Sequence, residues 1–154
     1  MSSIGTFLGR DHQQCDDQYA LAEARVVGNQ WELAASDFAA FRGMLEHHLG
    51  MEEQIMFPAL EQAMGHSGGP TGVMRAEHVH MRDLVQGMAD AIAARSGDEF
   101  FNHGDTLRML MRQHNLKEEG ILYPMADRFL VQHMPALLEQ MRAFEAAAEQ
   151  GVLP

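Results

Sequence analysis

The sequence predicts an all-α protein: an up-down-up-down four-helix bundle followed by a short extra C-terminal helix. Three observations support this fold class. Glycine, proline and serine breaks are few along the 154 residues. The runs between the breaks repeat apolar residues with the four-and-three spacing of bundled helices. No run alternates polar and apolar residues as a strand would. We therefore expect one domain over residues 1–154, with its bundle over about residues 8–130.

Three breaks separate the helices of the predicted bundle. They lie at residues 28–29, 65–70 and 96–98, where glycine, asparagine, serine or proline interrupts the apolar pattern. The intervening runs predict four helices, over residues 10–27, 30–64, 71–95 and 98–130. Pro135 is typical of the first turn of a helix, so a fifth, short helix is expected over residues 135–149.

Each bundle helix has one line of core positions, which we call its seam. The seams are Leu8, His12, Cys15, Tyr19, Ala22 and Val26; Ala34, Phe38, Phe41, Leu45, His48, Glu52, Ile55 and Ala59; Met74, His78, Met81, Val85, Met88 and Ile92; and Leu107, Met111, His114, Glu118, Ile121 and Met125. Six ionisable residues interrupt them: His12, His48, Glu52, His78, His114 and Glu118. With a rise of 1.5 Å per residue, an up-down bundle stacks the six at similar height.

A His-x-x-x-Glu-Glu sequence followed by an aromatic residue and proline occurs twice, once from His48 to Pro58 and once from His114 to Pro124. Residues four apart lie on one helix face, so each repeat directs a nitrogen and an oxygen toward a common point. Buried ionisable groups without partners cost several kcal/mol each, and neighbouring carboxylates repel each other. Two cations would remove both costs. The six interrupting residues are therefore predicted to be metal ligands.

Three different arrangements fit the six residues less well. A hydrogen-bonded polar layer does not account for six interruptions at one height. A mononuclear zinc site leaves a carboxylate pair unexplained. A ferritin-like site needs Glu-x-x-His twice, and the single instance, Glu77 to His80, lies off the seam. The remaining histidines fall off the seams or near turns and are left out of the site: His47, His66, His80, His103 and His133.

Composition limits the partners and the compartment. The net charge of −11 and the pI near 5.1 argue against binding to nucleic acid or to an anionic membrane surface. A single cysteine, Cys15, allows no intramolecular disulfide. No signal peptide and no apolar run of membrane-spanning length is present. The cytoplasm is therefore the expected location, while a protein partner and the oligomeric state are left open.

The pattern resembles the bacterial hemerythrin-like proteins, which carry the HHE cation-binding domain. The resemblance covers residues 8–130 and lies in the Asp11-His12 pair, the two repeats and the Glu77-His78 pair. It implies a non-haem centre of two iron ions joined by an oxo or hydroxo bridge. In that centre His12 and His48 would bind one iron and His78 and His114 the other, with Glu52 and Glu118 bridging both. Each octahedral iron would keep one open position.

Two features differ from the oxygen-carrying hemerythrins. Met74 stands where those proteins place a further imidazole, and His114-x-x-x-Glu118 replaces their His-x-x-x-x-Asp spacing. The ligand set is closer to the hemerythrin-like domains of proteins linked to iron–sulfur repair and nitric oxide stress, although their cysteine-bearing N-terminal segment is missing. The resemblance implies binding of, or reaction with, dioxygen, peroxide or nitric oxide in oxidative or nitrosative stress. The alternative is a protein that binds, stores or senses dioxygen, nitric oxide or iron without turnover, so enzymatic activity is left open.

No catalytic residue is assigned, but Cys15 and Tyr19 follow His12 at successive turns and are expected near the site. Cys15 is a candidate electron source or oxidation sensor, with a buried small hydrophobe as an equal alternative. Both tyrosines, Tyr19 and Tyr123, are expected to pack in the core. Glu53 and Glu119 are expected to face solvent, and Glu77 is expected to orient His78 or another neighbour if its side chain turns inward.

Overall fold

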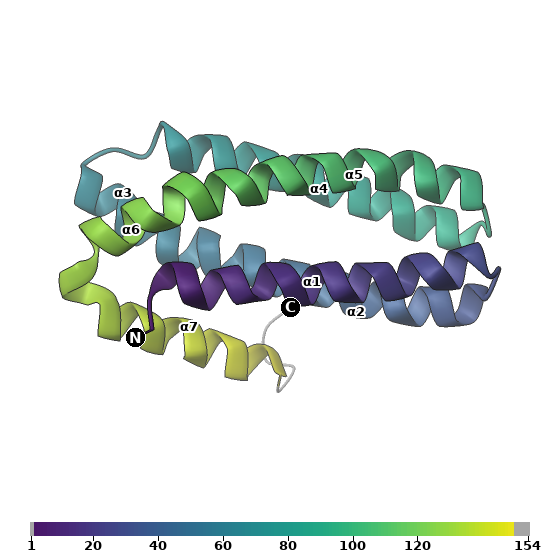
Figure 1. Cartoon of the computed structure of the whole chain (residues 1–154), viewed down its shortest axis with the longest axis horizontal. Helices are drawn as coiled ribbons and strands as arrows, with labels where there is room; N and C mark the ends of the chain where they lie inside the picture. Colours follow the sequence, from purple (N-terminus) through teal and green to yellow (C-terminus); the bar gives the residue numbers. More distant parts are fainter. Residues whose placement is uncertain (1, 150–154) are drawn as a thin grey trace.

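The computed structural model describes residues 2–149, and its regular structure within that range is entirely helical, with no strand. Long helices run side by side and a short helix lies across one side of them (Figure 1). The all-α bundle with a short C-terminal helix agrees with the predicted fold class. In chain order the elements are α1 (Ile4–Val27), α2 (Trp31–Met51), η1 (Glu52–Met56), α3 (Phe57–Met64), α4 (Pro70–Ala93), α5 (Gly97–Lys117), η2 (Glu118–Leu122), α6 (Tyr123–Phe129), η3 (Val131–His133) and α7 (Met134–Glu149).

The first helix begins six residues earlier than predicted, at Ile4 rather than residue 10. The Ser3 side chain caps it by accepting a hydrogen bond from the Thr6 N–H at 3.0 Å. The Asp127 carboxylate of α6 accepts from the N–H of Ile4 at 2.8 Å and from that of Gly5 at 3.3 Å. The contacts of Asp127 come from a helix distant in the sequence, so the sequence around residue 4 could not reveal them.

The predicted breaks all occur. Asn29 and Arg95 adopt positive φ angles of 56° and 55° in the turns after α1 and α4. Gly65 ends α3 with φ 83°, in the left-handed region that glycine enters without steric cost. Ser96 caps α5 by accepting from the Glu99 N–H at 3.2 Å. Local turn and cap chemistry therefore accounts for these helix ends.

The two repeats contain a turn of π-helix that the seam pattern did not predict. Each π-turn, η1 or η2, begins at the glutamate of its His-x-x-x-Glu pair and links two α-helices without a break. A π-turn accommodates one extra residue, which advances the buried face by one position. This corrects the seams: Ile121 is 60% exposed, while Leu122 is 2% exposed and takes its place. Similarly, Met56 and Leu60 are fully buried rather than Ile55 and Ala59.

The apolar core consists of two clusters on either side of the polar layer. One includes Tyr19, Phe41 and Phe100, between the ends of the helices that meet at the α1–α2 and α4–α5 turns. The other includes Phe57 and Tyr123, beneath α3, α6 and α7. The six ionisable seam residues lie between these clusters, with apolar packing on both sides.

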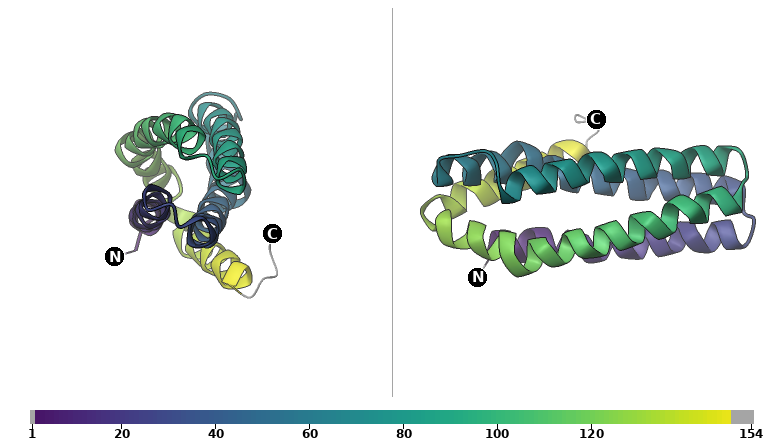
Figure 2. Two further views of the ribbon diagram at one scale, coloured as in Figure 1. Left: turned by 90° about the vertical axis from the view of Figure 1, so that its right-hand side faces the viewer. Right: turned by 90° about the horizontal axis from the view of Figure 1, so that it is seen from above.

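Helices α1 and α5 diverge, and a groove of about 730 Å³ lies between them. Viewed along and from above the bundle, α1 pairs with α2 and α4 pairs with α5 (Figure 2). The short helix α7 packs on α2, where a Cβ at Gly50 would lie only 2.8 Å from Cζ of Phe144. His47 stacks on the same phenylalanine at 5.2 Å, so it is partly buried against α7. None of the helices described is long and apolar enough to span a membrane.

Candidate metal centre

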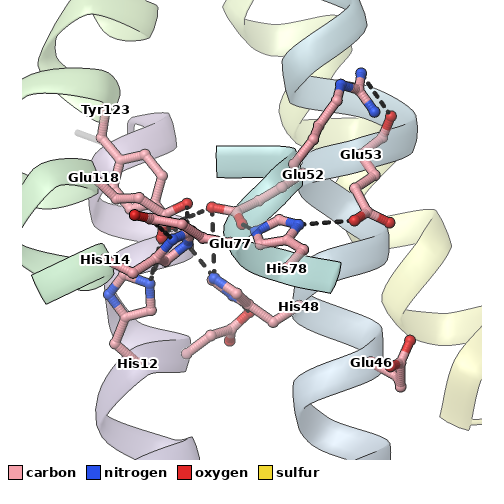
Figure 3. A network of polar contacts seen from close by, with 12 residues as sticks. His12, Glu46, His48, Glu52, Glu53, Glu77, His78, His114, Glu118 and Tyr123 are labelled. Atoms are coloured by element: carbon pink, nitrogen blue, oxygen red, sulfur yellow. Dashed lines mark hydrogen bonds and ion pairs between the residues drawn. The ribbon is translucent and has the colours of Figure 1, made fainter. Parts of the chain in front are cut away.

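The six predicted metal ligands converge at one level of the bundle, as Figure 3 shows for their side chains. They come from α1, α2, η1, α4, α5 and η2, so all the long helices contribute. None exceeds 7% exposure, and both glutamates are completely buried: His12, His48, Glu52, His78, His114 and Glu118. Water therefore cannot solvate these ionisable groups, and they must satisfy one another or bind something else.

The six side chains form two halves that share the glutamates. The imidazole centroids of His12 and His48 lie 4.8 Å apart, and those of His78 and His114 lie 5.0 Å apart. Glu118 places Oε1 3.0 Å from Nε2 of His12 and Oε2 3.1 Å from Nε2 of His114. Glu118 thus spans the two halves with its two oxygens.

Glu52 spans the same two halves from the opposite side. Its Oε1 lies 3.1 Å from Nε2 of His78, and its Oε2 lies 3.6 Å from Nε2 of His48. Groups of donor atoms within 4.8 Å of one another are Glu52, His78, His114 and Glu118 in one half, and His12, His48 and Glu118 in the other. Two carboxylates that each offer one oxygen to each imidazole pair have the arrangement that bridging carboxylates need.

Four atoms that could bind a metal in the half around His78 and His114 have no hydrogen-bond partner, although each is fully buried. They are Oε1 of Glu52, Nε2 of His78, Nε2 of His114 and Oε2 of Glu118. An unsatisfied buried polar atom costs about 1–3 kcal/mol, and more if it is charged. Four such atoms facing one another fit a cation, because imidazole nitrogens and carboxylate oxygens would direct their lone pairs at it.

Nδ1 of each seam histidine, the ring nitrogen that points away from the centre, forms a hydrogen bond with a carboxylate. A carboxylate can only accept, so each Nδ1–H donates. The distances are 2.6 Å from His12 to Glu119, 3.3 Å from His48 to Asp11, 2.8 Å from His78 to Glu53 and 2.8 Å from His114 to Glu77. With Nδ1 protonated, Nε2 is the nitrogen that can offer a lone pair toward the centre.

These four carboxylates connect the helices in a closed circuit. Asp11 joins α1 to α2, Glu53 joins η1 to α4, Glu77 joins α4 to α5, and Glu119 joins η2 back to α1. Each is the immediate sequence neighbour of a predicted ligand. The expectation that Glu53 faces solvent is therefore wrong, whereas the Glu119 side chain is 53% exposed although it accepts from His12. Glu77 turns inward and orients a neighbouring imidazole, that of His114.

Cationic side chains fix two of the outer carboxylates. The Arg82 guanidinium donates to both oxygens of Glu53 at 2.9 Å, and the Lys117 ammonium donates to Glu77. The pKa of Glu53 falls to about 2: burial opposes ionisation, but hydrogen bonds from His78 and Arg82 outweigh it. Both carboxylates are therefore charged acceptors at neutral pH.

The pKa values of the innermost side chains of the site are strongly shifted. Burial alone would lower the pKa of His78, but the carboxylates of Glu52 and Glu53 beside its two ring nitrogens raise it to about 9. Burial would raise the pKa of Glu118, but its hydrogen bonds with the surrounding side chains, imidazoles among them, hold it well below the usual value. The protein without metal thus balances buried carboxylates with protons on imidazoles, which a metal cation would displace.

Tyr123 is a member of the site, although its sequence position predicted core packing. Its hydroxyl donates to Oε2 of Glu52 at 2.6 Å and lies 3.0 Å from Oε1 of Glu118. Tyr123 follows Glu118 by five residues, which is one turn of π-helix, so the two side chains share a face. The sequence did show an aromatic residue at the equivalent position of both repeats. Without the π-turn, however, it did not show that this residue faces the site.

Cys15 and Tyr19 have different positions. Cys15 lies beside His12 and His48 on the wall of a small cavity, and burial raises the pKa of its thiol to about 11, so the thiol is neutral. Tyr19 lines the α1–α5 groove, and its ring packs against Phe41. The structure thus places Cys15 next to the candidate ligands and Tyr19 farther along the bundle.

The sequence profile described as the Hemerythrin HHE cation binding domain matches residues 4–126. The matched range includes all six candidate ligands, the four outer carboxylates and Tyr123. Comparisons with curated proteins and with solved structures gave no match.

Proposed function

Because the chain belongs to the hemerythrin HHE cation-binding family, we propose that its buried centre holds two iron ions and reacts with dioxygen, peroxide or nitric oxide. The observation that carries the proposal is the set of four buried, unpartnered donor atoms facing one another from Glu52, His78, His114 and Glu118. Cation binding follows from the family, and the identity and number of the ions are the proposed part.

The proposed assignment follows the two halves of the site. His12 and His48 would hold one iron, His78 and His114 the other, and both glutamates would bridge them. Imidazole and carboxylate are suitable ligands for iron, and iron bound there would supply the electrons for reduction of a small oxidant. The outer carboxylates keep each Nε2 aimed inward, so the ligands are oriented before metal arrives.

The protein restricts which molecules reach the centre. A cavity of about 10 Å³ lies against His12, His48 and His114, with apolar walls that include Leu45 and Met81. This volume is about the minimum that holds a single water molecule. The walls offer few polar partners, so the cavity favours a diatomic molecule or peroxide over a larger organic substrate.

The groove between α1 and α5 provides the route from solvent. It shares His12, Met111 and Asn115 with the small cavity, so these side chains separate the two spaces. A rotamer change of the flexible Met111 side chain would connect them. We propose this as the entry path, with oxidative or nitrosative stress as the physiological setting.

Anaerobic reconstitution with ferrous iron tests the reaction. Dioxygen, hydrogen peroxide and nitric oxide are then added separately, with the optical spectrum and turnover followed by stopped flow. We expect rapid oxidation by dioxygen or peroxide without a long-lived adduct. A coloured adduct that persists for minutes and is released under vacuum would contradict this and favour the binding or sensing alternative.

Met74 provides a variant for the same experiment. Its buried side chain lies one turn before His78, where oxygen carriers have a further imidazole. Met74→His should slow the oxidation, because an added imidazole would occupy a metal position in the His78–His114 half. Val79→His, on the exposed side of the same helix, is the matched control and should leave the oxidation rate unchanged.

A further inference from the structure

The Tyr123 hydroxyl lies among the donor atoms of one half of the centre only. Besides Glu52 and Glu118, it approaches Nε2 of His12 at 3.2 Å and Nε2 of His48 at 3.4 Å. Metal–nitrogen and metal–oxygen bonds of about 2.0–2.2 Å place adjacent ligand atoms about 3 Å apart. The hydroxyl oxygen is therefore spaced from these four atoms as a fifth ligand of the same ion would be.

A comparison of the two sequence repeats shows that only the second one has a hydroxyl at the position of Tyr123. Phe57 occupies the position of Tyr123 in the first repeat, and its ring stacks on His78 at 5.6 Å and 23°. The Tyr123 ring stacks on His12 at 5.7 Å and 23°. The two rings thus have the same relation to the site, and the hydroxyl is their difference.

The two halves of the site also differ in which of their polar atoms lack a hydrogen-bond partner. All four unpartnered donor atoms lie in the His78–His114 half, whereas the facing atoms of His12, His48 and both glutamates are within reach of the Tyr123 hydroxyl. Once a metal occupies the His12–His48 half, the four atoms near the hydroxyl direct their lone pairs at that metal. The hydroxyl of Tyr123, which is 1% exposed, would then have the metal as its remaining partner within the site.

We propose that Tyr123 is a seventh protein ligand, bound as a phenolate to the metal held by His12 and His48. This rests on the proposed iron centre and deepens it. On metal entry the phenol O–H bond breaks, an oxygen–metal bond forms, and the proton leaves to solvent with those displaced from the imidazoles. The open position is then confined to the metal of His78 and His114, instead of one on each ion.

The test compares the wild type with Tyr123→Phe, which removes one oxygen atom and reproduces the residue of the first repeat. The ferric wild type should show visible phenolate-to-iron charge-transfer absorption and phenolate ring modes in its resonance Raman spectrum. Tyr123→Phe should lose both while keeping two irons per chain. Tyr19→Phe is the matched control, because its hydroxyl lies outside the centre, and it should keep both signals.

Azide, added to the ferric proteins, gives a second readout. One azide should bind per wild-type chain and two per Tyr123→Phe chain. Phe57→Tyr should strengthen the phenolate signals by adding a hydroxyl beside His78. A wild type that binds two irons without phenolate signals, or whose signals survive in Tyr123→Phe, would overturn the phenolate ligand alone. A chain that binds no iron would overturn the proposed function and this inference together.

Discussion

At the scale of single residues, each seam histidine is fixed from two sides. Its Nε2 faces a glutamate shared between the halves, and its Nδ1 donates to a carboxylate on a neighbouring element. This geometry selects one tautomer and one ring orientation in each case. Metal affinity should therefore depend on residues that never touch the metal.

Glu77→Gln tests the outer carboxylates. We expect it to weaken metal binding roughly 10- to 100-fold, because an amide holds the His114 imidazole less strongly than a carboxylate and does not raise its basicity. Competition against a chelator of known affinity measures the change. Asp83→Asn removes an exposed carboxylate from the same helix and should have no effect. Equal losses in both variants would mean that overall charge, rather than orientation of His114, sets the affinity.

The adjacent pair His47 and His48 separates metal binding from packing. His48→Ala should lose bound metal and lower the unfolding temperature, because the remaining buried donors are left uncompensated. His47→Ala should keep the metal but lower stability by about 0.5–1.5 kcal/mol through lost stacking on Phe144. Metal analysis and thermal denaturation of both variants check this. Loss of metal in His47→Ala alone would show that the register assigned to α2 is wrong.

At the scale of elements, every seam residue predicted in α1 and α4 is buried, as are those of α2 and α5 before the glutamates, although the pattern missed further buried residues such as Ile4 and Ala91. Beyond Glu52 and Glu118 it failed by one position, as Ile121 shows with its 60% exposure. A pattern of fixed α-helical period contains no signal for an inserted residue. The same shift hid Tyr123, whose five-residue spacing from Glu118 places it on another face of an ordinary α-helix.

The outer carboxylates were hidden for a related reason. Asp11, Glu53, Glu77 and Glu119 lie off the seams, where solvent exposure is the ordinary expectation for an acidic residue. Their partners are histidines on neighbouring elements, so only the three-dimensional arrangement reveals the contacts. The early start of α1 has in part the same origin, since Asp127 of α6 accepts from the N–H groups of Ile4 and Gly5 in addition to the local Ser3 cap.

Removing the extra residue tests the role of the π-turn. Without Gly120, the buried residues Leu122, Tyr123 and Ala126 would follow Glu118 at spacings of three, four and seven, as an α-helix places them. The chain should stay helical with Tyr123 and Glu118 on one face, but the one-residue shorter spacing would move the Tyr123 hydroxyl away from its present contacts with Glu52 and His12. Metal affinity should therefore fall at least about tenfold, or 1.4 kcal/mol. Circular dichroism and chelator competition give the two readouts.

Gly120→Ala is the matched control for the deletion. A Cβ at this exposed glycine meets no atom within 4 Å, so the chain length and the π-turn are retained. Metal affinity should be unchanged, and stability should rise by about 0.5–1 kcal/mol because alanine loses less backbone entropy. If the deletion variant binds metal as tightly as Gly120→Ala, the π-turn does not position the ligands.

At the scale of the whole molecule, the polar layer divides the core into two apolar clusters and joins four long helices at one level. Buried carboxylates and imidazoles at this level oppose folding unless a cation or protons balance them. The fold therefore encloses a charged centre beside the α1–α5 groove, which is the proposed entry path. The number of ions that the centre holds decides between a dinuclear metal site and a simpler polar layer.

Anaerobic equilibrium dialysis against ferrous iron, followed by elemental analysis, measures that number directly. We predict two irons per chain, lost together when Glu118, which spans both halves, is changed to alanine. A single bound zinc with no restorable iron would contradict the dinuclear site, and two irons that survive Glu118→Ala would contradict a pair of ions bridged by Glu118.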